Sequence, residues 1–166
     1  MDCILFRHGI AVDPGEWGGP DAQRPLTAKG IEKTRAAAVG LRNLGIKPTH
    51  LLSSSLVRAL ETAKIIQDMF RFHEEAKKCK ELMPGAPPEQ ATVLLASLPQ
   101  DACVICVGHE PHLGHTAGFL VCGAPVPGLS LKKAGACCIR FDEVAKPGEG
   151  LLRWWLMPSQ LRALGH

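Results

Sequence analysis

The sequence predicts an α/β fold: a single-domain, three-layer α/β/α sandwich built around a mainly parallel central sheet. Short apolar runs alternate with longer stretches whose apolar residues recur at helical spacing, which is typical of this class. The run "ACVICVG" at 102–108 is apolar without interruption, as expected for a strand buried on both faces of a parallel sheet. A length of 166 residues is close to the roughly 150 residues of one domain, so we expect one domain over 1–166.

The first elements are a buried strand, a long loop and a capped helix. Residues 2–7 form a short apolar run that predicts the strand. The segment 13–25 is rich in Gly and Pro, which predicts a loop, and its length is typical of lids and binding loops. Thr27 is a suitable N-cap for a helix over 28–44 that ends at Gly45.

The rest of the chain continues the alternation and ends with two neighbouring strands. The runs 135–142 and 150–157 are separated by a Pro/Gly turn, which favours adjacent strands. Residues 74–86 are ambiguous. The other expected strands are 49–54 and 102–109, and the other expected helices are 55–70, 88–98, 111–122 and 158–164.

The composition excludes several classes of protein. Hydrophobic residues make up 46% and charged residues 21%, as in ordinary soluble domains. The net charge of +3 is small, and the Lys and Arg residues form no run of about five, so nucleic acid is not an expected partner. No window approaches the roughly 20 apolar residues of a membrane span. Asp2 stands where an export signal would be positively charged, so we expect a cytoplasmic protein.

The seven cysteines do not predict disulfides or a metal site. Their number is odd and no export signal accompanies them. Cys103 and Cys106 have the spacing of a zinc or redox motif, but an offset of three along a strand sends their side chains to opposite faces. Cys137 and Cys138 are adjacent in another strand-like run. We therefore expect all four to pack in the core.

Four side chains suited to an anion follow the ends of expected strands. Arg7 and His8 follow the first strand, Arg58 lies in the first turn after the second, and His109 follows the run "VICV". In open α/β sheets, ligands bind outside the carboxyl ends of the strands. The sequence therefore predicts that these groups gather at one edge of the sheet.

Arg58 and Gly9 support an anion site more specifically. With Ser55 as N-cap, a glutamate at the third helical position would complete a capping box, and this sequence has Arg58 there. A cation in the first turn opposes the helix dipole, and a bound anion would reverse that preference. The alternative for Arg58 is a surface ion pair with Glu61. Gly9, which lacks a Cβ, lets an oxyanion or the chain approach the backbone beside His8, whose alternative is a neutral core histidine.

Four segments together resemble one family. They are "FRHGIA" at 6–11, "RPLTAKG" at 24–30, "SSSLVRALETA" at 53–63 and "VGHEPHLG" at 107–114. In this order they resemble the histidine phosphatase superfamily, whose fold is called phosphoglycerate mutase-like. The short chain and the "GHEP" form of the last segment resemble its small bacterial branch, the phosphohistidine phosphatases.

The resemblance implies a mechanism that these residue types support. His8 would be the nucleophile that forms a phosphohistidine intermediate, while Arg7, Arg58 and His109 would hold the equatorial phosphoryl oxygens. The two guanidinium groups supply the countercharge, so no metal and no cofactor is expected.

Other residues complete the expected substrate site. We place Gly9, Arg24 and Trp17 there, and Arg24 either reaches the phosphate or pins the loop. His109, His112 and His115 are spaced by three, but such steps drift round a helix and no carboxylate or cysteine completes a metal site in the motif.

The general acid and the substrate are left open by the sequence. The resemblance places a glutamate after the second motif, about where Glu81 lies, although Glu81 could equally be a solvated charge. The leading substrate is phosphohistidine in a protein partner, such as a phosphorelay domain, because that leaving group needs no strong acid. The alternatives are small phosphate monoesters or sugar phosphates with Glu81 as acid, and a phosphate-binding module without turnover.

Overall fold

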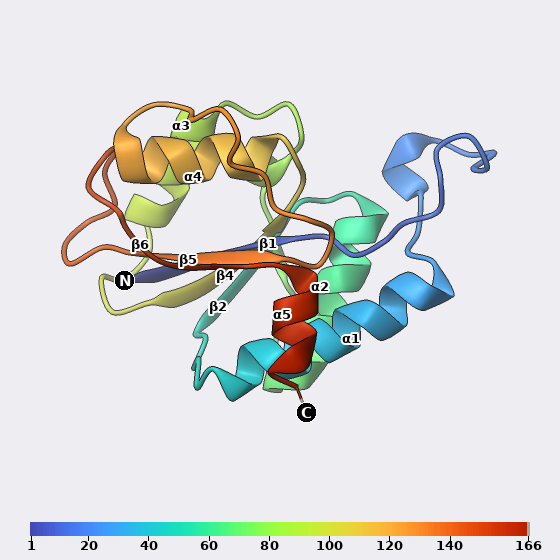
Figure 1. The fold of residues 1–166 in the computed structure, drawn as a ribbon. Coiled ribbons are helices and arrows are strands. Elements are labelled where there is room, and N and C mark those ends of the chain that lie inside the picture. The colour runs from blue at the N-terminus through green and yellow to red at the C-terminus, as the bar shows by residue number, and fades with distance from the viewer. Residues whose placement is uncertain (166) are drawn as a thin grey trace.

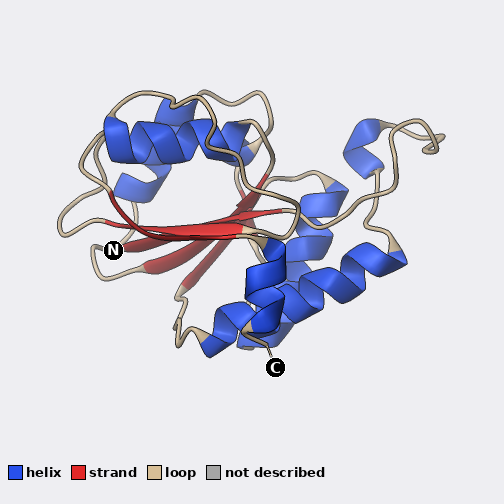
Figure 2. Ribbon diagram, in the orientation of Figure 1, coloured by secondary structure: helices blue, strands red, loops and turns tan. Residues whose placement is uncertain are grey.

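A single mixed sheet organises the molecule (Figures 1 and 2). The computed structural model describes residues 1–165. The sheet has six strands in the order β3-β2-β4-β1-β5-β6, of which β5 and β6 are antiparallel to their neighbours and the others pair in parallel. The strands are β1 (Asp2–Arg7), β2 (His50–Ser53), β3 (Lys77–Lys78), β4 (Cys103–Gly108), β5 (Ala136–Arg140) and β6 (Leu151–Leu156).

Helices cover both faces of the sheet. In Figure 2 the helices α3 and α4 lie above the strands, and α1, α2 and α5 lie below them. The helices are α1 (Ala28–Asn43), α2 (Val57–Phe70), α3 (Pro88–Ala96), α4 (His112–Cys122) and α5 (Pro158–Ala163), with short 3₁₀ turns η1 (Asp21–Gln23) and η2 (Lys80–Leu82). The predicted three-layer α/β/α sandwich with a mainly parallel sheet is confirmed.

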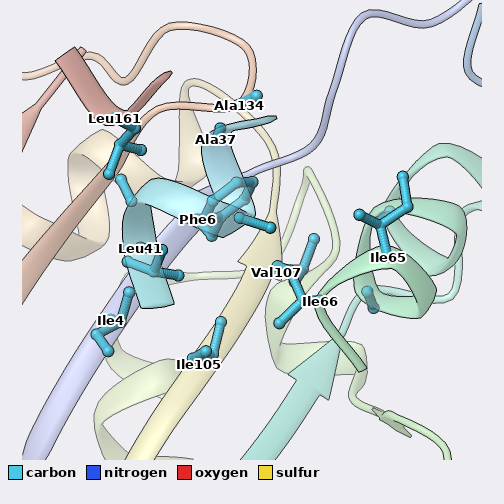
Figure 3. Packing of buried hydrophobic residues seen from close by; sticks show 14 of the residues in the cluster. Ile4, Phe6, Ala37, Leu41, Ile65, Ile66, Ile105, Val107, Ala134 and Leu161 are labelled. Atoms are coloured by element: carbon cyan, nitrogen blue, oxygen red, sulfur yellow. The ribbon is translucent and has the colours of Figure 1, made fainter. Parts of the chain in front are cut away.

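Alternation along the central strands builds two apolar cores. Ile4 and Phe6 of β1 pack into the core shared with α1, α2 and α5, where Leu41 and Leu161 also lie (Figure 3). Leu5 points to the other face, into the core under α3 and α4. A strand buried on both faces must be apolar at every position, which is why "CILF" and "CVICV" show no polar alternation.

The cysteines follow the same alternation. Cys106 packs in the core under α3 and α4, whereas Cys103 lies against the opposite core, as their offset of three requires. Cys137 and Cys138 are likewise divided between the two cores. All seven cysteines are free thiols. The prediction of core packing for these four residues is confirmed.

Most expected boundaries agree with the structure, and the start of α2 does not. Thr27 caps α1 by accepting a hydrogen bond from the Gly30 N–H at 2.9 Å, as predicted. The helix α2, however, begins at Val57, and its N-cap is Leu56 rather than Ser55. The reason is that the Ser54 hydroxyl accepts from the Leu56 N–H at 3.2 Å and holds the chain extended for one residue longer.

The helices and the clusters of polar side chains limit what the described residues can do. Over residues 1–165, no helix is long and apolar enough to cross a membrane. Within the same range, no group of three or more His, Cys, Asp or Glu side chains is arranged to hold a metal ion.

Candidate active site

The predicted anion-binding residues follow three neighbouring strands. In the parallel pairing of β1 with β4, Arg7 lies opposite Gly108, and in that of β2 with β4, Ser53 lies opposite Val107. The parallel pairing of β1 with β4 continues one residue beyond the strands, where the His8 N–H donates a hydrogen bond to the Gly108 carbonyl at 3.0 Å. The structure therefore brings the segments after β1, β2 and β4 to one edge of the sheet, as the sequence predicts.

His8 is held in one tautomer by its own backbone. Its Nδ1 lies 2.7 Å from the carbonyl oxygen of Gly9. A carbonyl oxygen can only accept a hydrogen bond, so Nδ1 carries the ring proton and the lone pair is at Nε2. The pKa of His8 is lowered to about 4, chiefly by burial and also by the charges of Arg58 and Arg7, although the bond to Gly9 acts in the opposite direction. At neutral pH the ring is therefore uncharged.

At Gly9 the backbone that follows His8 comes close to the helices α1 and α2. Its N–H donates to the Thr62 hydroxyl of α2 at 3.0 Å, and that hydroxyl donates to the Arg58 carbonyl at 2.8 Å. On the other side, a Cβ on Gly9 would collide with the hydroxyl oxygen of Thr34 in α1. With Thr34 in place a side chain at position 9 has no room, and the close contact helps to fix the backbone that holds His8.

Arg7 is anchored through the segment that precedes β5. Its Nη1 donates to the Leu131 carbonyl at 2.7 Å. Leu131 is itself held in place, because its N–H donates a hydrogen bond to Glu110 Oε1 at 2.8 Å. Glu110 Oε2 also accepts from the Gly114 N–H at 3.3 Å. Glu110 thus fixes the peptide that aims the Arg7 guanidinium.

Arg58 reaches the site from the first turn of α2 and is only 6% exposed. Its ion-pair partner is Asp21 rather than Glu61: Arg58 Nη2 lies 3.2 Å from Asp21 Oδ2, and Nη1 donates to the Asp21 carbonyl at 3.0 Å. Glu61 instead accepts from the Leu26 N–H at 2.6 Å. The alternative of a surface pair between Arg58 and Glu61 is therefore wrong.

His109 faces His8 from the end of β4. The centroids of the two rings are 5.0 Å apart, and the ring planes are tilted by 52°. The Nε2 of His109 lies 2.8 Å from the Ser54 hydroxyl. The pKa of His109 is lowered to about 3, chiefly by burial and also by the neighbouring His8 and Arg58.

Three nitrogens in this cluster have no partner. Among the described residues, Arg7 Nε, Arg58 Nε and His109 Nδ1 are buried and make no hydrogen bond. A buried donor without a partner destabilises a protein by about 1–3 kcal/mol, so such groups are usually satisfied by a ligand or by ordered water. Two guanidinium groups and a histidine with free nitrogens suit an oxyanion.

Comparisons with known proteins agree with this geometry. The model of the histidine phosphatase superfamily (branch 1) matches residues 3–83. An uncharacterized protein from Picosynechococcus sp. is 36% identical over 146 residues, which cover 84% of this chain and 85% of that protein. The phosphohistidine phosphatase SixA of Escherichia coli (strain K12) is 27% identical over 165 residues, which cover 98% of this chain and 97% of SixA.

A solved structure extends the match to the whole fold. The structure of the protein histidine phosphatase SixA complexed with tungstate has a TM-score of 0.84 to this chain at 25% identity, covering 97% of this chain and 99% of the other. The chain belongs to the histidine phosphatase superfamily. The phosphoglycerate mutase-like fold expected from its motifs is confirmed.

In this histidine phosphatase, Glu81 lies beside the cluster rather than in it. It is in the middle of η2, is partly exposed, and makes no hydrogen bond among the described residues. The turn itself borders the site, because the sulfur of Met83 accepts hydrogen bonds from the hydroxyls of Ser54 and Ser55, each at 3.3 Å. The turn therefore reaches Ser54, which contacts His109, whereas the Glu81 carboxylate makes no hydrogen bond to the cluster among the described residues.

Two loop residues expected at the substrate are engaged within the loop. Arg24 donates from Nη1 to the Val12 carbonyl at 2.8 Å and from Nε to Asp21 Oδ1 at 3.0 Å, so it pins the loop. Trp17 is partly exposed and donates from Nε1 to the Pro20 carbonyl at 2.9 Å.

Three contributors to the site were not anticipated from the sequence of this histidine phosphatase. Asp21 pairs with both arginines of the loop and helix, Glu110 supports Arg7 through a peptide, and Ser54 contacts His109. Asp21 stands three residues before Arg24, a spacing that could have indicated a local ion pair. Glu110 lies inside the "GHEP" segment and directly follows His109.

Proposed function

We propose that this histidine phosphatase hydrolyses phosphohistidine in a protein partner through a covalent intermediate on His8. The observation that carries the proposal is the hydrogen bond from His8 Nδ1 to the Gly9 carbonyl. It leaves an unprotonated Nε2 in a cluster of cationic side chains, as a nucleophile toward phosphorus must be. The low pKa of His8, about 4, supports the same role, because the ring is not inactivated by protonation at neutral pH.

The first proposed step transfers the phosphoryl group to the enzyme. The lone pair of His8 Nε2 attacks phosphorus in line, and the bond between phosphorus and the substrate's imidazole nitrogen breaks. That nitrogen keeps the electron pair and is protonated by water. The Nδ1–H of His8 stays hydrogen-bonded to Gly9, whose carbonyl dipole stabilises the positive charge that develops on the ring.

The second step returns the enzyme to its starting state. Water attacks the phosphorus, the bond to Nε2 breaks with its electrons returning to the ring, and a water proton passes to solvent. In both steps the guanidinium groups of Arg7 and Arg58 hold the equatorial oxygens, and the Nδ1–H of His109 does so in the tautomer whose Nε2 accepts from the Ser54 hydroxyl. The nitrogens without partners support this role, and no metal ion is needed for charge compensation.

The local carboxylates favour a P–N over a P–O bond. The carboxylate in contact with Arg58 is Asp21, whose pKa is lowered by its hydrogen bond to Arg24 and by both arginines, so it is a poor proton donor. A phosphorylated imidazole leaves readily once its ring is protonated and needs no strong acid in the site. Similarity to SixA over nearly the whole of both chains supports the same substrate class. A phosphorelay domain is the partner we propose.

The second candidate is a phosphatase of small phosphate monoesters or sugar phosphates. It is favoured by the position of η2, whose Met83 touches the serines at the edge of the site. Glu81 lies in this turn, two residues before Met83. With such a substrate Glu81 would be the general acid.

The test is phosphate release from a phosphohistidine peptide and from an aryl phosphate, in the presence of a chelator. We expect wild type to hydrolyse the peptide, and His8→Ala to lose activity by at least about 1000-fold with either substrate. A labelled phosphoenzyme that is stable to alkali and labile to acid should form only with His8 in place. Full activity of His8→Ala would overturn the mechanism, and binding of phosphate without turnover would leave the chain as a binding module.

A second variant separates the two candidates. Glu81→Gln should leave hydrolysis of the phosphohistidine peptide within about twofold of wild type if no acid is used. The matched control is Glu89→Gln, an exposed position in the first turn of α3. A selective loss of aryl phosphate hydrolysis in Glu81→Gln, absent from the control, would assign the acid role to Glu81 and favour the monoester candidate.

A further inference from the structure

A groove lined by five cationic side chains opens next to the candidate active site. It has a volume of about 350 Å³ and runs between the end of β1, the helix α1, the segment before β5 and the start of α5. In Figure 1, α5 lies against α1 below the end of β5 that borders this segment. The cationic residues are Arg7, Lys33, Lys132, Lys133 and Arg162.

The positive charge of this basic groove is not neutralised within the chain. No acidic residue lines it, and over residues 1–165 none of Lys33, Lys132, Lys133 and Arg162 forms an ion pair. Elsewhere on the surface, lysines such as Lys64 pair with neighbouring acids. Because the whole chain carries a net charge of only +3, this is a local concentration of charge.

The basic groove is continuous with the phosphoryl site. Arg7 belongs to both, since it lines the groove and directly precedes His8 in the chain. Lys133 also acts on the catalytic centre, because its charge contributes to lowering the pKa of His8. A substrate whose phosphoryl group lies on His8 would therefore extend its neighbouring atoms toward these lysines.

The kind of cation indicates what the groove holds. Lys132 and Lys133 are exposed, and Lys33 and Arg162 are partly exposed, so their charged ends stay hydrated and mobile. A fixed second phosphate is usually held by buried arginine forks and backbone N–H groups, whereas flexible lysines suit several carboxylates in variable positions. Such a surface favours a polypeptide with dispersed negative charge over a compact diphosphate.

We propose that the basic groove docks an acidic segment of the phosphoprotein substrate, so that aspartates or glutamates near the phosphorylated histidine contact Lys33, Lys132 and Arg162. The inference rests on the proposed function, which supplies the phosphohistidine, and it adds that the segment around this residue is negatively charged. The groove selects and steers the partner, and the chemistry at His8 is unchanged by it.

The test compares two phosphohistidine peptides in one assay. The first carries Asp and Glu around the phosphorylated residue, and the second has Asn and Gln at the same positions. At low salt, wild type should hydrolyse the acidic peptide with a kcat/KM about tenfold higher. The preference should disappear in 0.5 M salt, where exposed charges are screened within a few ångströms.

The groove variant is Lys33→Gln/Lys132→Gln/Arg162→Gln, and the control is Lys47→Gln/Lys64→Gln/Lys146→Gln. Both remove three positive charges, but the control positions are exposed and do not line the groove. The ratio of kcat/KM between the two peptides should fall to about one in the groove variant and stay near tenfold in the control. A wild type without preference, or an equal loss in both variants, would overturn the docking proposal and leave the proposed function standing.

A binding measurement keeps the two proposals separate. The unphosphorylated acidic peptide, followed by fluorescence anisotropy, should bind wild type and lose about tenfold in affinity in the groove variant. This holds even if the chain hydrolyses no phosphohistidine, in which case only the proposed function fails. If the groove variant loses affinity for pyrophosphate but retains its preference for the acidic peptide, the groove is a site for a second phosphate and the docking proposal is wrong.

Discussion

The imidazole rings of His8 and His109 pack against each other in a tilted arrangement, with their centroids 5.0 Å apart. Both rings are almost fully buried, and both lie near Arg58. Burial and positive neighbours disfavour the charged imidazolium, so the pKa of His8 is about 4 and that of His109 about 3. The folded protein therefore holds two neutral histidines at pH values where an unfolded chain would protonate them.

This pair predicts a loss of stability in mild acid. Between about pH 6.5, the usual histidine pKa, and pH 4, the unfolded state binds protons that the folded state does not. The free energy of unfolding should fall as pH falls through this window, by as much as about 1.4 kcal/mol per pH unit for each histidine. Urea denaturation at pH 7, 6, 5 and 4.5 measures the slope.

Substitution of one histidine tests the assignment. His8→Gln should reduce the slope by about one proton, since only His109 of the pair still titrates. His73→Gln, at an exposed position, is the matched control. A slope that is the same in all three proteins would mean that His8 is not buried in its neutral form.

The contact of Gly9 with Thr34 predicts a rescue experiment. Gly9→Ala should destabilise the protein by about 1–3 kcal/mol and lower kcat, because the new methyl group forces the His8 turn away from α1. The Thr34 hydroxyl has no hydrogen-bond partner among the described residues, so Thr34→Ala in the same chain removes the obstacle without breaking a bond. The double variant should recover much of the activity.

Thr34→Val is the matched control for this rescue. It places a methyl group where the hydroxyl was, so Gly9→Ala/Thr34→Val should stay as impaired as Gly9→Ala. Equal recovery with Ala and Val at position 34 would show that the collision is not with this side-chain atom. Thermal unfolding and kcat with an aryl phosphate measure the two effects separately.

Glu110 should act as a positioning residue for Arg7. Glu110→Ala leaves the Leu131 N–H without its acceptor, so the Leu131 carbonyl that accepts from Arg7 is no longer held in place. The inhibition constant of inorganic phosphate should therefore rise by about tenfold. Glu110→Gln keeps one acceptor oxygen and should recover most of the affinity. The control Glu143→Ala, at an exposed position, should bind phosphate as wild type does. If Gln were no better than Ala, the negative charge rather than the hydrogen bond would hold Arg7.

Asp21 should compete with the ligand for Arg58. Its carboxylate lies 3.2 Å from the Arg58 guanidinium and repels an incoming phosphate dianion. Asp21→Asn should therefore bind inorganic phosphate about threefold more tightly, and Asp13→Asn, elsewhere in the same loop, should not. Weaker binding by Asp21→Asn would show instead that the pair holds Arg58 in its binding geometry. Product inhibition of aryl phosphate hydrolysis gives both constants.

The parts of this fold that depend on local chemistry could be predicted from the sequence. The uninterrupted apolar runs gave β1 and β4, and Thr27 with Gly45 bounded α1, because burial and capping act over a few neighbouring residues. The two-residue strand β3 has no such pattern: Lys77 and Lys78 are exposed and pair with β2 only through their backbone. Residues 74–86 were ambiguous for that reason.

The supports of the candidate site depend on distant contacts. The pairing of Asp21 with Arg58 joins positions 37 residues apart and requires the loop 13–25 to fold back over α2. The support of Arg7 by Glu110 passes through the peptide of Leu131, and backbone atoms leave no signature in a sequence. Side chains at strand ends could therefore be predicted from the sequence, but the atoms that orient them could not.

The strand order delays assembly of the catalytic centre during synthesis of the chain. The strand β1 precedes the other strands of the sheet in the chain but pairs only with β4 and β5, so Ile4 pairs with Ile105 and Cys138, which are both more than about a hundred residues later. A nascent chain that ends before β4 contains His8 and Arg58, but it lacks His109 and the Gly108 carbonyl that accepts from the His8 N–H. Such long-range pairing also makes refolding slow relative to helical proteins. Recovery of phosphatase activity after denaturation would therefore report the completed sheet, and a collapsed intermediate would be silent in that assay.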